Sequence, residues 1–139
     1  RCPKELLTNE QYNAPHPNQM HAYGDTYGAH REYLEFDVSQ HRQLQAWCSE
    51  FGIAYSTSVW DMTSAREIVP LQPELLKIGS ASNCHYEMLA YLCDDFAGEI
   101  HISLGMTSRE EEERLVDFVT KKKRSTDVVL YACTSGYPV

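Results

Sequence analysis

The sequence predicts an α/β fold made of parallel βα repeats, and two observations carry this prediction. Short apolar segments typical of strands begin near residues 53, 75, 100 and 128, and a spacing of about 20–30 residues is the period of βα units. Amphipathic stretches with helical periodicity lie between these segments. Because right-handed crossovers make such strands parallel, the loops after the strands gather at one end of the sheet. We therefore expect a ligand site at the carboxyl ends of the strands.

The two parts of the chain differ in pattern. Residues 1–35 are rich in Pro, Asn, His, Gly and Tyr and show little periodicity, which favours a long ordered loop or arm. Residues 36–139 hold the βα units. Their first helix carries apolar residues at positions i, i+3, i+4 and i+7, the spacing of one buried face, and Gly52 can end it in the left-handed conformation. The residues on that face are Leu44, Trp47, Cys48 and Phe51.

The remaining elements alternate regularly. Pro70 ends the second expected helix and Gly98 stops the third. At the start of the fourth, Thr107 and Glu110 have the spacing of a capping box, in which two side chains satisfy free helix amides. The expected helices span 63–69, 85–97 and 107–122, and the expected strands span 53–57, 75–78, 100–103 and 127–132.

Charge and hydropathy exclude two classes of partner. A formal net charge of -8 argues against nucleic acid, since a binder of DNA or RNA usually presents a basic surface. The basic run at 121–124 follows an acidic run at 110–113, the order that a helix dipole favours, so it indicates a solvated helix. No apolar run approaches the roughly 20 residues of a membrane span. We expect neither nucleic acid nor membrane as a partner.

Cysteine and histidine spacing gives no metal-binding pattern. The five cysteines form no C-x-x-C pair and no regular framework, which is typical of reduced thiols in a cytoplasmic protein. The six histidines form no H-x-x-x-H pair and no cluster with cysteine. We therefore expect no metal ligands in this chain.

Hydroxyl side chains and glycines gather where the strands end, and Lys77 lies among them. Small residues expose backbone N–H groups, and an ammonium adds full charge, so these turns suit a phosphate or a carboxylate. A simpler explanation of any single turn is that serine and glycine are common in tight βα turns. A third explanation makes Lys77 a Schiff-base nucleophile, but a lysine of that kind needs a lowered pKa, which an anion-lined pocket opposes. The turns concerned contain Ser58, residues 77–80, residues 103–106 and residues 134–137.

Other candidate residues have a structural explanation that is at least as good. His101 shares a strand face with Ser103, which favours a hydrogen-bonded interior histidine over a proton-transfer or metal role. Asp61 is expected to cap a helix rather than act as a general base. Cys133 is expected to be a buried thiol rather than a nucleophile. Three tyrosines of the arm are expected to pack on the barrel rather than stack on a substrate. They are Tyr23, Tyr27 and Tyr33.

Five motifs occur in the order and spacing of one known family. They are TYGAHREYLEF at 26–36, GIAYSTSVWD at 52–61, KIGSAS at 77–82, ISLGM at 102–106 and CTSGYP at 133–138. In these motifs the chain resembles the sialic acid synthase family over nearly its whole length. The resemblance implies a (β/α)8 TIM barrel followed by a small antifreeze-like domain, in an enzyme that is a homodimer. This chain would supply about strands 3 to 6, with the rest of the barrel and the antifreeze-like domain lying outside it.

The resemblance also implies a reaction. The family joins phosphoenolpyruvate to an open-chain N-acylated mannosamine-type sugar, an N-acyl amino sugar, and releases phosphate and a nine-carbon keto acid. It uses a divalent metal, Mn2+ or Mg2+, whose ligands have no counterpart in this chain. The catalytic residues of this chain are not assigned, and the chain alone is expected to be inactive.

Site residues follow from the same motifs. Tyr137 matches a tyrosine beside the sugar, and Ser82 stands where many members have an acid thought to touch it. Trp60 replaces a phenylalanine of the family, and some members have asparagine at the position of Ser135. The positions that would bind phosphoenolpyruvate are Ser58, Lys77, Ser80, Ser103 and Ser135.

Two other functions stay open. Ser82 in place of an acid keeps a related phosphoenolpyruvate-dependent sugar acid synthase with a different product in view. The second function is that of a non-catalytic domain that binds phosphorylated metabolites or another protein. It stays open because half a barrel leaves open sheet edges and exposed apolar helix faces that need a partner.

Overall fold

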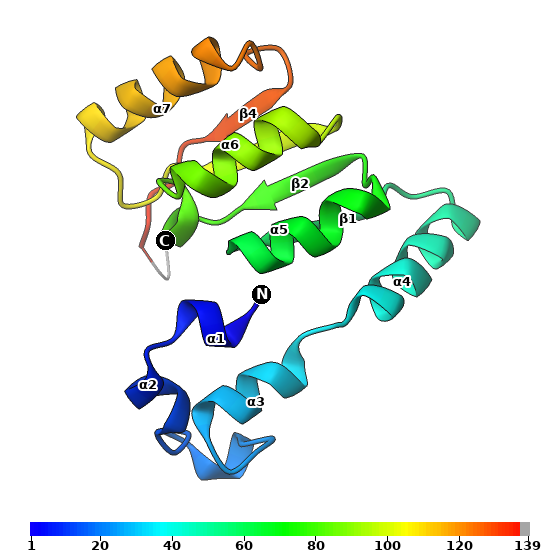
Figure 1. The fold of residues 1–139 in the computed structure, drawn as a ribbon, viewed down its shortest axis with the longest axis vertical. Coiled ribbons are helices and arrows are strands. Elements are labelled where there is room, and N and C mark those ends of the chain that lie inside the picture. The colour runs from blue at the N-terminus through cyan, green and yellow to red at the C-terminus, as the bar shows by residue number, and fades with distance from the viewer. Residues whose placement is uncertain (137–139) are drawn as a thin grey trace.

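The computed structural model describes residues 1–136, in which four strands form one parallel sheet in the order β1-β2-β3-β4 (Figure 1). The strands are β1 (Ser56–Val59), β2 (Leu75–Ile78), β3 (Glu99–Ser103) and β4 (Val128–Tyr131). All three pairings are parallel, with Ser58 opposite Lys77 and Lys77 opposite His101. The predicted class of parallel βα repeats is confirmed.

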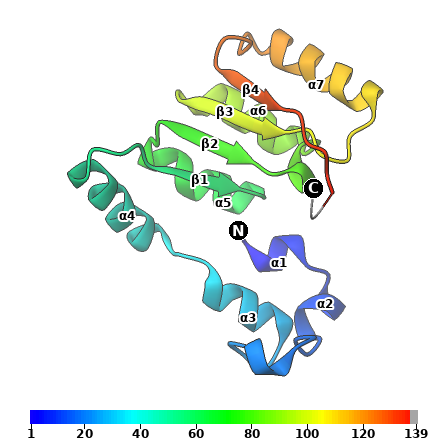
Figure 2. The same ribbon diagram turned by 180° about the vertical axis from the view of Figure 1, so that it is seen from behind.

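A helix follows each of the first three strands and covers one face of the sheet. These helices are α5 (Met62–Ile68), α6 (Tyr86–Asp95) and α7 (Arg109–Lys121). The first two lie in front of the sheet in Figure 1 and behind it in Figure 2. Beneath them lies the core, which includes the fully buried Leu76, Ile78, Ile100 and Ile102. Burying each such side chain contributes about 1.5–3 kcal/mol, so this face supplies most of the stability of the unit.

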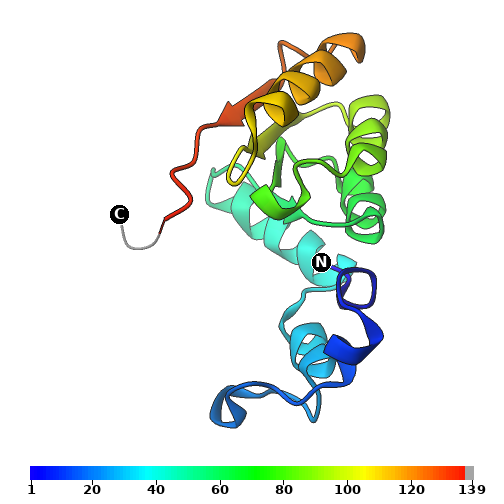
Figure 3. The ribbon, with the colours of Figure 1, turned by 90° about the vertical axis from the view of Figure 1, so that its left-hand side faces the viewer.

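The opposite face of the sheet carries the alternate residues of the same strands. Side chains alternate along a strand, so Lys77 and His101 point away from the core residues on either side of them. Figure 3 shows the segment after β4, in red, on the side of the sheet away from α5 and α6. The polar face and this segment therefore lie together.

The expected helix caps are present, and one of them lies one residue later than predicted. Asp61 caps α5 by accepting a hydrogen bond from Ser64 N–H, as predicted. Gly52 has φ +65, the left-handed stop that was expected after the first barrel helix. The capping box of α7 uses Ser108 and Glu111, one residue later than predicted, because Thr107 instead donates its hydroxyl to the Leu104 carbonyl.

The helix before β1, α4 (Val38–Glu50), corrects the prediction of a buried apolar face. None of its residues is buried, and Trp47 and Phe51 are 51% and 75% exposed. Helical spacing shows which side chains share a face but does not supply the surface that covers it. In Figure 2, α4 extends beyond the β1 edge of the sheet, where residues 1–136 leave these two rings open.

Two other boundaries differ from expectation. The first strand begins at Ser56 rather than residue 53, since Ile53 is 60% exposed and the pairing with β2 starts at Ser56. The segment 1–35, expected as a long ordered loop or arm, contains short helices whose length is too small to give a periodic signal. They are α1 (Pro3–Leu6), α2 (Asn9–Asn13), α3 (Tyr27–Leu34) and the 3-10 helix η1 (Gln19–His21).

Two further 3-10 turns complete the fold, η2 (Val69–Leu71) after α5 and η3 (Ser80–Ser82) after β2. Across residues 1–136, no helix combines the length and the hydropathy that a membrane span requires.

Candidate active site

A cavity of about 590 Å³ lies at the carboxyl ends of the strands, where a ligand site was expected. Each strand end contributes to its wall: Trp60 follows β1, Ser80 follows β2, Ser103 ends β3 and Ser135 follows β4. Its volume falls within the roughly 300–1,000 Å³ of small-molecule sites. Three of the predicted serines therefore line one cavity.

Two of these serines meet across Gly105, in the turn after β3. The Gly105 N–H donates to Ser80 Oγ at 3.1 Å. A Cβ atom at position 105 would lie 2.5 Å from Ser80 Oγ and 2.8 Å from Ser135 Oγ, both closer than a side chain tolerates. Ser135 itself has φ +55, a left-handed conformation that is costly for a residue other than glycine. Glycine at 105 thus lets hydroxyls from the β2 and β4 ends come together.

Lys77 joins this group through Ser103. Its ammonium donates to Ser103 Oγ at 2.5 Å and to the Ile78 carbonyl at 3.1 Å, and it lies 5.5 Å from the centre of the Tyr131 ring. None of the ion pairs within residues 1–136 involves this lysine. The site therefore holds a positive charge that the described residues do not neutralise.

The other predicted site residues lie elsewhere. Ser58 is opposite Lys77 in the sheet but lines a separate cavity of about 140 Å³ with Glu35 and His41. Ser82 is 7% exposed and donates its hydroxyl to the Trp60 carbonyl at 2.9 Å, so the structure gives it a packing role. Its contact with a sugar stays a prediction that this placement does not favour. Tyr137 lies outside the described residues.

His41, which lines the small cavity beside Ser58, forms a polar pair with the buried Tyr55. His41 Nδ1 and the Tyr55 hydroxyl are 2.5 Å apart. Burial lowers the pKa of His41 and raises the pKa of Tyr55, so both side chains are favoured in their neutral forms.

Two residues of the site were not predicted from the sequence. Asn83 is 5% exposed, and its side-chain amide donates to the Ser103 carbonyl at 3.0 Å, which braces the end of β3. Trp60 was noted only as a replacement for phenylalanine, yet it forms a wall of the cavity. Its ring lies 3.1 Å from the point where a Cβ on Gly79 would sit. The sequence feature that could have indicated Asn83 was its place as a polar residue directly after KIGSAS.

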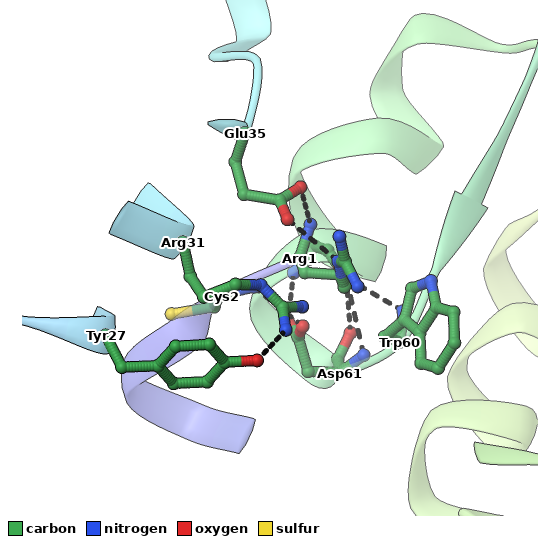
Figure 4. A network of polar contacts seen from close by, with 8 residues as sticks. Arg1, Cys2, Tyr27, Arg31, Glu35, Trp60 and Asp61 are labelled. Carbon is green, nitrogen blue, oxygen red and sulfur yellow. Dashed lines mark hydrogen bonds and ion pairs between the residues drawn. The ribbon is translucent and has the colours of Figure 1, made fainter. Parts of the chain in front are cut away.

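The arm is joined to the end of β1 by a polar network (Figure 4). The Arg1 side chain donates to Glu35 at 2.8 Å and its guanidinium lies 5.4 Å from the centre of the Trp60 ring. The Cys2 N–H donates to Asp61 at 2.8 Å. These contacts hold the first residues of the arm against a wall of the cavity.

The weaker candidates have mixed outcomes. His101 is hydrogen-bonded as predicted, with Nδ1 2.7 Å from the Tyr131 hydroxyl and Nε2 3.0 Å from Glu99. The prediction that Cys133 is buried is wrong: it is exposed and lines the cavity, because the chain leaves the sheet before it. Two of the three arm tyrosines are exposed, Tyr23 by 58% and Tyr33 by 68%, and they stack on each other rather than on the sheet.

Comparisons with known proteins agree with this architecture. The NeuB family model matches residues 1–139. An N-acetylneuraminate-9-phosphate synthase of Drosophila melanogaster is 35% identical over 118 residues, which cover 85% of this chain and 31% of that protein. Those of Mus musculus and Homo sapiens are each 29% identical over 119 residues, covering 86% of this chain and 32% of theirs. The chain thus spans about a third of the length of these curated relatives.

The fold has a solved counterpart. The crystal structure of an N-acetylneuraminic acid (sialic acid) synthetase from Leptospira borgpetersenii serovar Hardjo-bovis, in complex with citrate, superimposes with a TM-score of 0.72. The match has 24% sequence identity and covers 84% of this chain and 41% of that one. It confirms that the four parallel strands and their helices are part of a TIM barrel. The family model matches from the first residue to the last, and the chain belongs to the NeuB family.

Proposed function

We propose that this chain forms part of a sialic-acid-type synthase, which condenses phosphoenolpyruvate and water with an N-acylated mannosamine-type sugar to give a nine-carbon keto acid and phosphate. The observation that carries the proposal is Lys77, whose ammonium has no carboxylate partner within residues 1–136 and reaches the serine-lined cavity through Ser103. A buried or half-buried ammonium without a counterion is costly, so an anionic ligand would be favoured there. Membership of the NeuB family and the names of the curated relatives support the same activity.

The donors of the site suit a phosphate or carboxylate. An ammonium has three N–H donors, and two of those on Lys77 have acceptors within residues 1–136. Ser103 accepts from Lys77, and Ser80 accepts from Gly105, so each hydroxyl keeps its own proton to donate to a ligand. Charge-assisted bonds of this kind are roughly twice as strong as neutral ones. These residues would bind and orient phosphoenolpyruvate, and the stereochemistry of attack would be set by where they hold it.

The names of the relatives point to the acceptor. Condensation adds three carbons to the aldehyde end of a six-carbon sugar, so C6 of the sugar becomes C9 of the product. A product phosphorylated at O9, as named for the relatives of 29–35% identity, therefore derives from a sugar phosphorylated at O6. We propose N-acetylmannosamine 6-phosphate as the acceptor, with the unphosphorylated sugar as the competing candidate.

The family resemblance also implies a divalent metal, Mn2+ or Mg2+, which would polarise the sugar aldehyde. Within residues 1–136, no three His, Cys, Asp or Glu side chains converge on one point. These residues do not fit a metal centre, so no step at a metal is assigned to them. The metal requirement, the homodimer and the cytoplasmic location stay predictions.

The test is phosphate release from phosphoenolpyruvate by the complete gene product with Mn2+. Three reactions are compared: without sugar, with N-acetylmannosamine, and with N-acetylmannosamine 6-phosphate. We expect release only with a sugar, fastest with the 6-phosphate, together with a nine-carbon keto acid detected by mass spectrometry. A folded protein that binds phosphoenolpyruvate but releases no phosphate with either sugar would contradict the synthase and favour an anion-binding domain.

A further inference from the structure

A chain of polar contacts crosses the open face of the sheet and ends at Lys77. It begins at Glu99, at the start of β3, whose carboxylate lies 3.0 Å from Nε2 of His101. Nδ1 of His101 lies 2.7 Å from the hydroxyl of Tyr131, at the end of β4. The face of the Tyr131 ring lies 5.5 Å below the Lys77 ammonium. Four residues of three strands are thus connected on the face opposite the core.

The register of the sheet explains how these residues meet. His101 is opposite Lys77, and Tyr131 is opposite Ser103, the residue to which Lys77 donates. Residues paired in this way project from the same face of a parallel sheet. The Lys77 ammonium therefore reaches toward the neighbouring strands, where it donates to Ser103 of β3 and lies over the ring of Tyr131 of β4.

With the imidazole of His101 in its neutral form, the direction of each hydrogen bond follows. A carboxylate only accepts, so Nε2 of His101 donates to Glu99. In a neutral imidazole the other nitrogen is then an acceptor, and it receives the hydroxyl proton of Tyr131. Tyr131 is 41% exposed, and this bond is what holds its ring in one orientation.

The ring in turn acts on the lysine. A lysine side chain has four rotatable bonds and loses much rotamer freedom when it is held in place. The ring of Tyr131 attracts the ammonium by a cation–π interaction without neutralising its charge, as a carboxylate would. The lysine is therefore kept near Ser103 while its charge stays available to a ligand.

We infer that Tyr131, oriented by His101 and Glu99, is a positioning residue that holds the Lys77 ammonium at the cavity for an anionic substrate. The inference rests on the proposed function, because it assigns the held ammonium to phosphoenolpyruvate. In this proposal neither Tyr131 nor His101 needs to contact the substrate. Both act through Lys77.

Steady-state kinetics of variants of the complete gene product test this inference. Removing the ring in Tyr131→Leu should raise the KM for phosphoenolpyruvate about tenfold. Because the lysine contacts the anion before and during reaction, kcat should stay within about twofold. Tyr131→Phe keeps the ring but loses its anchor, and should raise the KM only about threefold, as should His101→Leu.

A double variant separates positioning from independent effects. If His101 acts through Tyr131, His101→Leu combined with Tyr131→Leu should have the KM of Tyr131→Leu alone. The matched control is Tyr91→Leu on α6, which makes the same chemical change at a partly buried residue of the core. It should lower the midpoint of thermal unfolding and leave the KM unchanged.

A second readout does not depend on turnover. When lysines are labelled with carbon-13 methyl groups, the Lys77 signal, assigned with Lys77→Arg, should show a ring-current shift that Tyr131→Leu removes and Tyr131→Phe keeps. An unchanged KM and an unchanged Lys77 signal in Tyr131→Leu would overturn the inference. If the KM of the double variant rose by the product of the two single-variant factors, the role of His101 would be overturned. A wild type without affinity for phosphoenolpyruvate would overturn the proposed function, and the ring-current shift would then decide the positioning separately.

Discussion

The two faces of the sheet are built from alternate residues of the same strands, and one face forms the core whereas the other carries the candidate site. On the helix-covered face, Leu76, Ile78 and Ile102 are fully buried and belong to the hydrophobic core. On the open face, Lys77 donates a hydrogen bond to Ser103, which lines the cavity. Adjacent residues of β2 or β3 therefore differ in role, because one side chain stabilises the core and the next faces the candidate binding site.

This arrangement indicates that different residues of the same strands determine stability and substrate binding. The core residues neighbour the site residues in sequence, but the sheet lies between them in space. Substitutions at adjacent positions should change one property each, and four predictions test this separation from the largest effect to the smallest.

Lys77→Ala should have the largest effect on activity. Removing the partner of a held anion costs about 2–5 kcal/mol, so kcat/KM for phosphoenolpyruvate should fall at least about thirtyfold. The free energy of unfolding should not fall, because the side chain contributes nothing to the core and its ammonium has no counterion within residues 1–136. Phosphate release and urea unfolding of the complete gene product measure the two quantities. Wild-type kinetics in this variant would remove Lys77 from the site.

Leu76→Ala, one residue away, should have the opposite effect. Truncating a fully buried leucine leaves a cavity and should lower the free energy of unfolding by about 3 kcal/mol. In the fraction that remains folded, the KM for phosphoenolpyruvate should be unchanged. Leu76→Met, which conserves volume, is the control and should cost less than about 1.5 kcal/mol. A KM that rose with the loss of stability would show that the two faces are coupled.

Gly105→Ala tests the meeting point of the hydroxyls. The new Cβ would lie 2.5 Å from Ser80 Oγ and 2.8 Å from Ser135 Oγ, so both serines must move away from the cavity wall. We expect the KM for phosphoenolpyruvate to rise about tenfold, equivalent to about 1.4 kcal/mol.

The matched control is Gly52→Ala. This glycine has φ +65 and open space around its Cβ position, so alanine there should cost about 1 kcal/mol of stability through strain alone. If both glycine variants raised the KM equally, the effect at Gly105 would be a general loss of stability rather than displacement of the serines.

Local patterns predicted much of this fold and part of the site. The strand at Leu75–Ile78 was predicted to the residue, and the cap at Asp61 was also correct, because both depend on neighbours within a few residues. Ser80, Ser103 and Ser135 line one cavity because strand ends gather by topology.

The rest depends on contacts that are distant in sequence. A helix before the first strand was expected and is present as α4, but the predicted burial of its apolar face is wrong within residues 1–136, where Trp47 is exposed. Tyr131 gave no signal of its own, since its contacts lie 30 residues away at His101 and on a second strand at Lys77. Cys133 was predicted buried because thiols usually are, whereas the path of the chain beyond β4 leaves it exposed.

The smallest effect should appear at the sheet edge, where His41 pairs with Tyr55. Burial holds the pKa of His41 below its unfolded value of about 6.5, so the unfolded chain binds the proton more readily. The stabilisation by neutral His41 is therefore present above the unfolded pKa and is lost as pH falls through the folded pKa. The free energy of unfolding should decline with acid less steeply in His41→Gln than in the wild type.

Burial also lowers the pKa of His30, but both proteins retain that residue and its contribution cancels in the difference. Urea unfolding at pH 7.5 and at pH 5.5 gives the four values needed. Since His41 lines the small cavity with Ser58 and not the cavity of Ser80 and Ser103, the KM for phosphoenolpyruvate at pH 7.5 should be the same in both proteins. A raised KM in His41→Gln would instead connect the two cavities and extend the binding face to the β1 edge, where Ser58 would regain its predicted role.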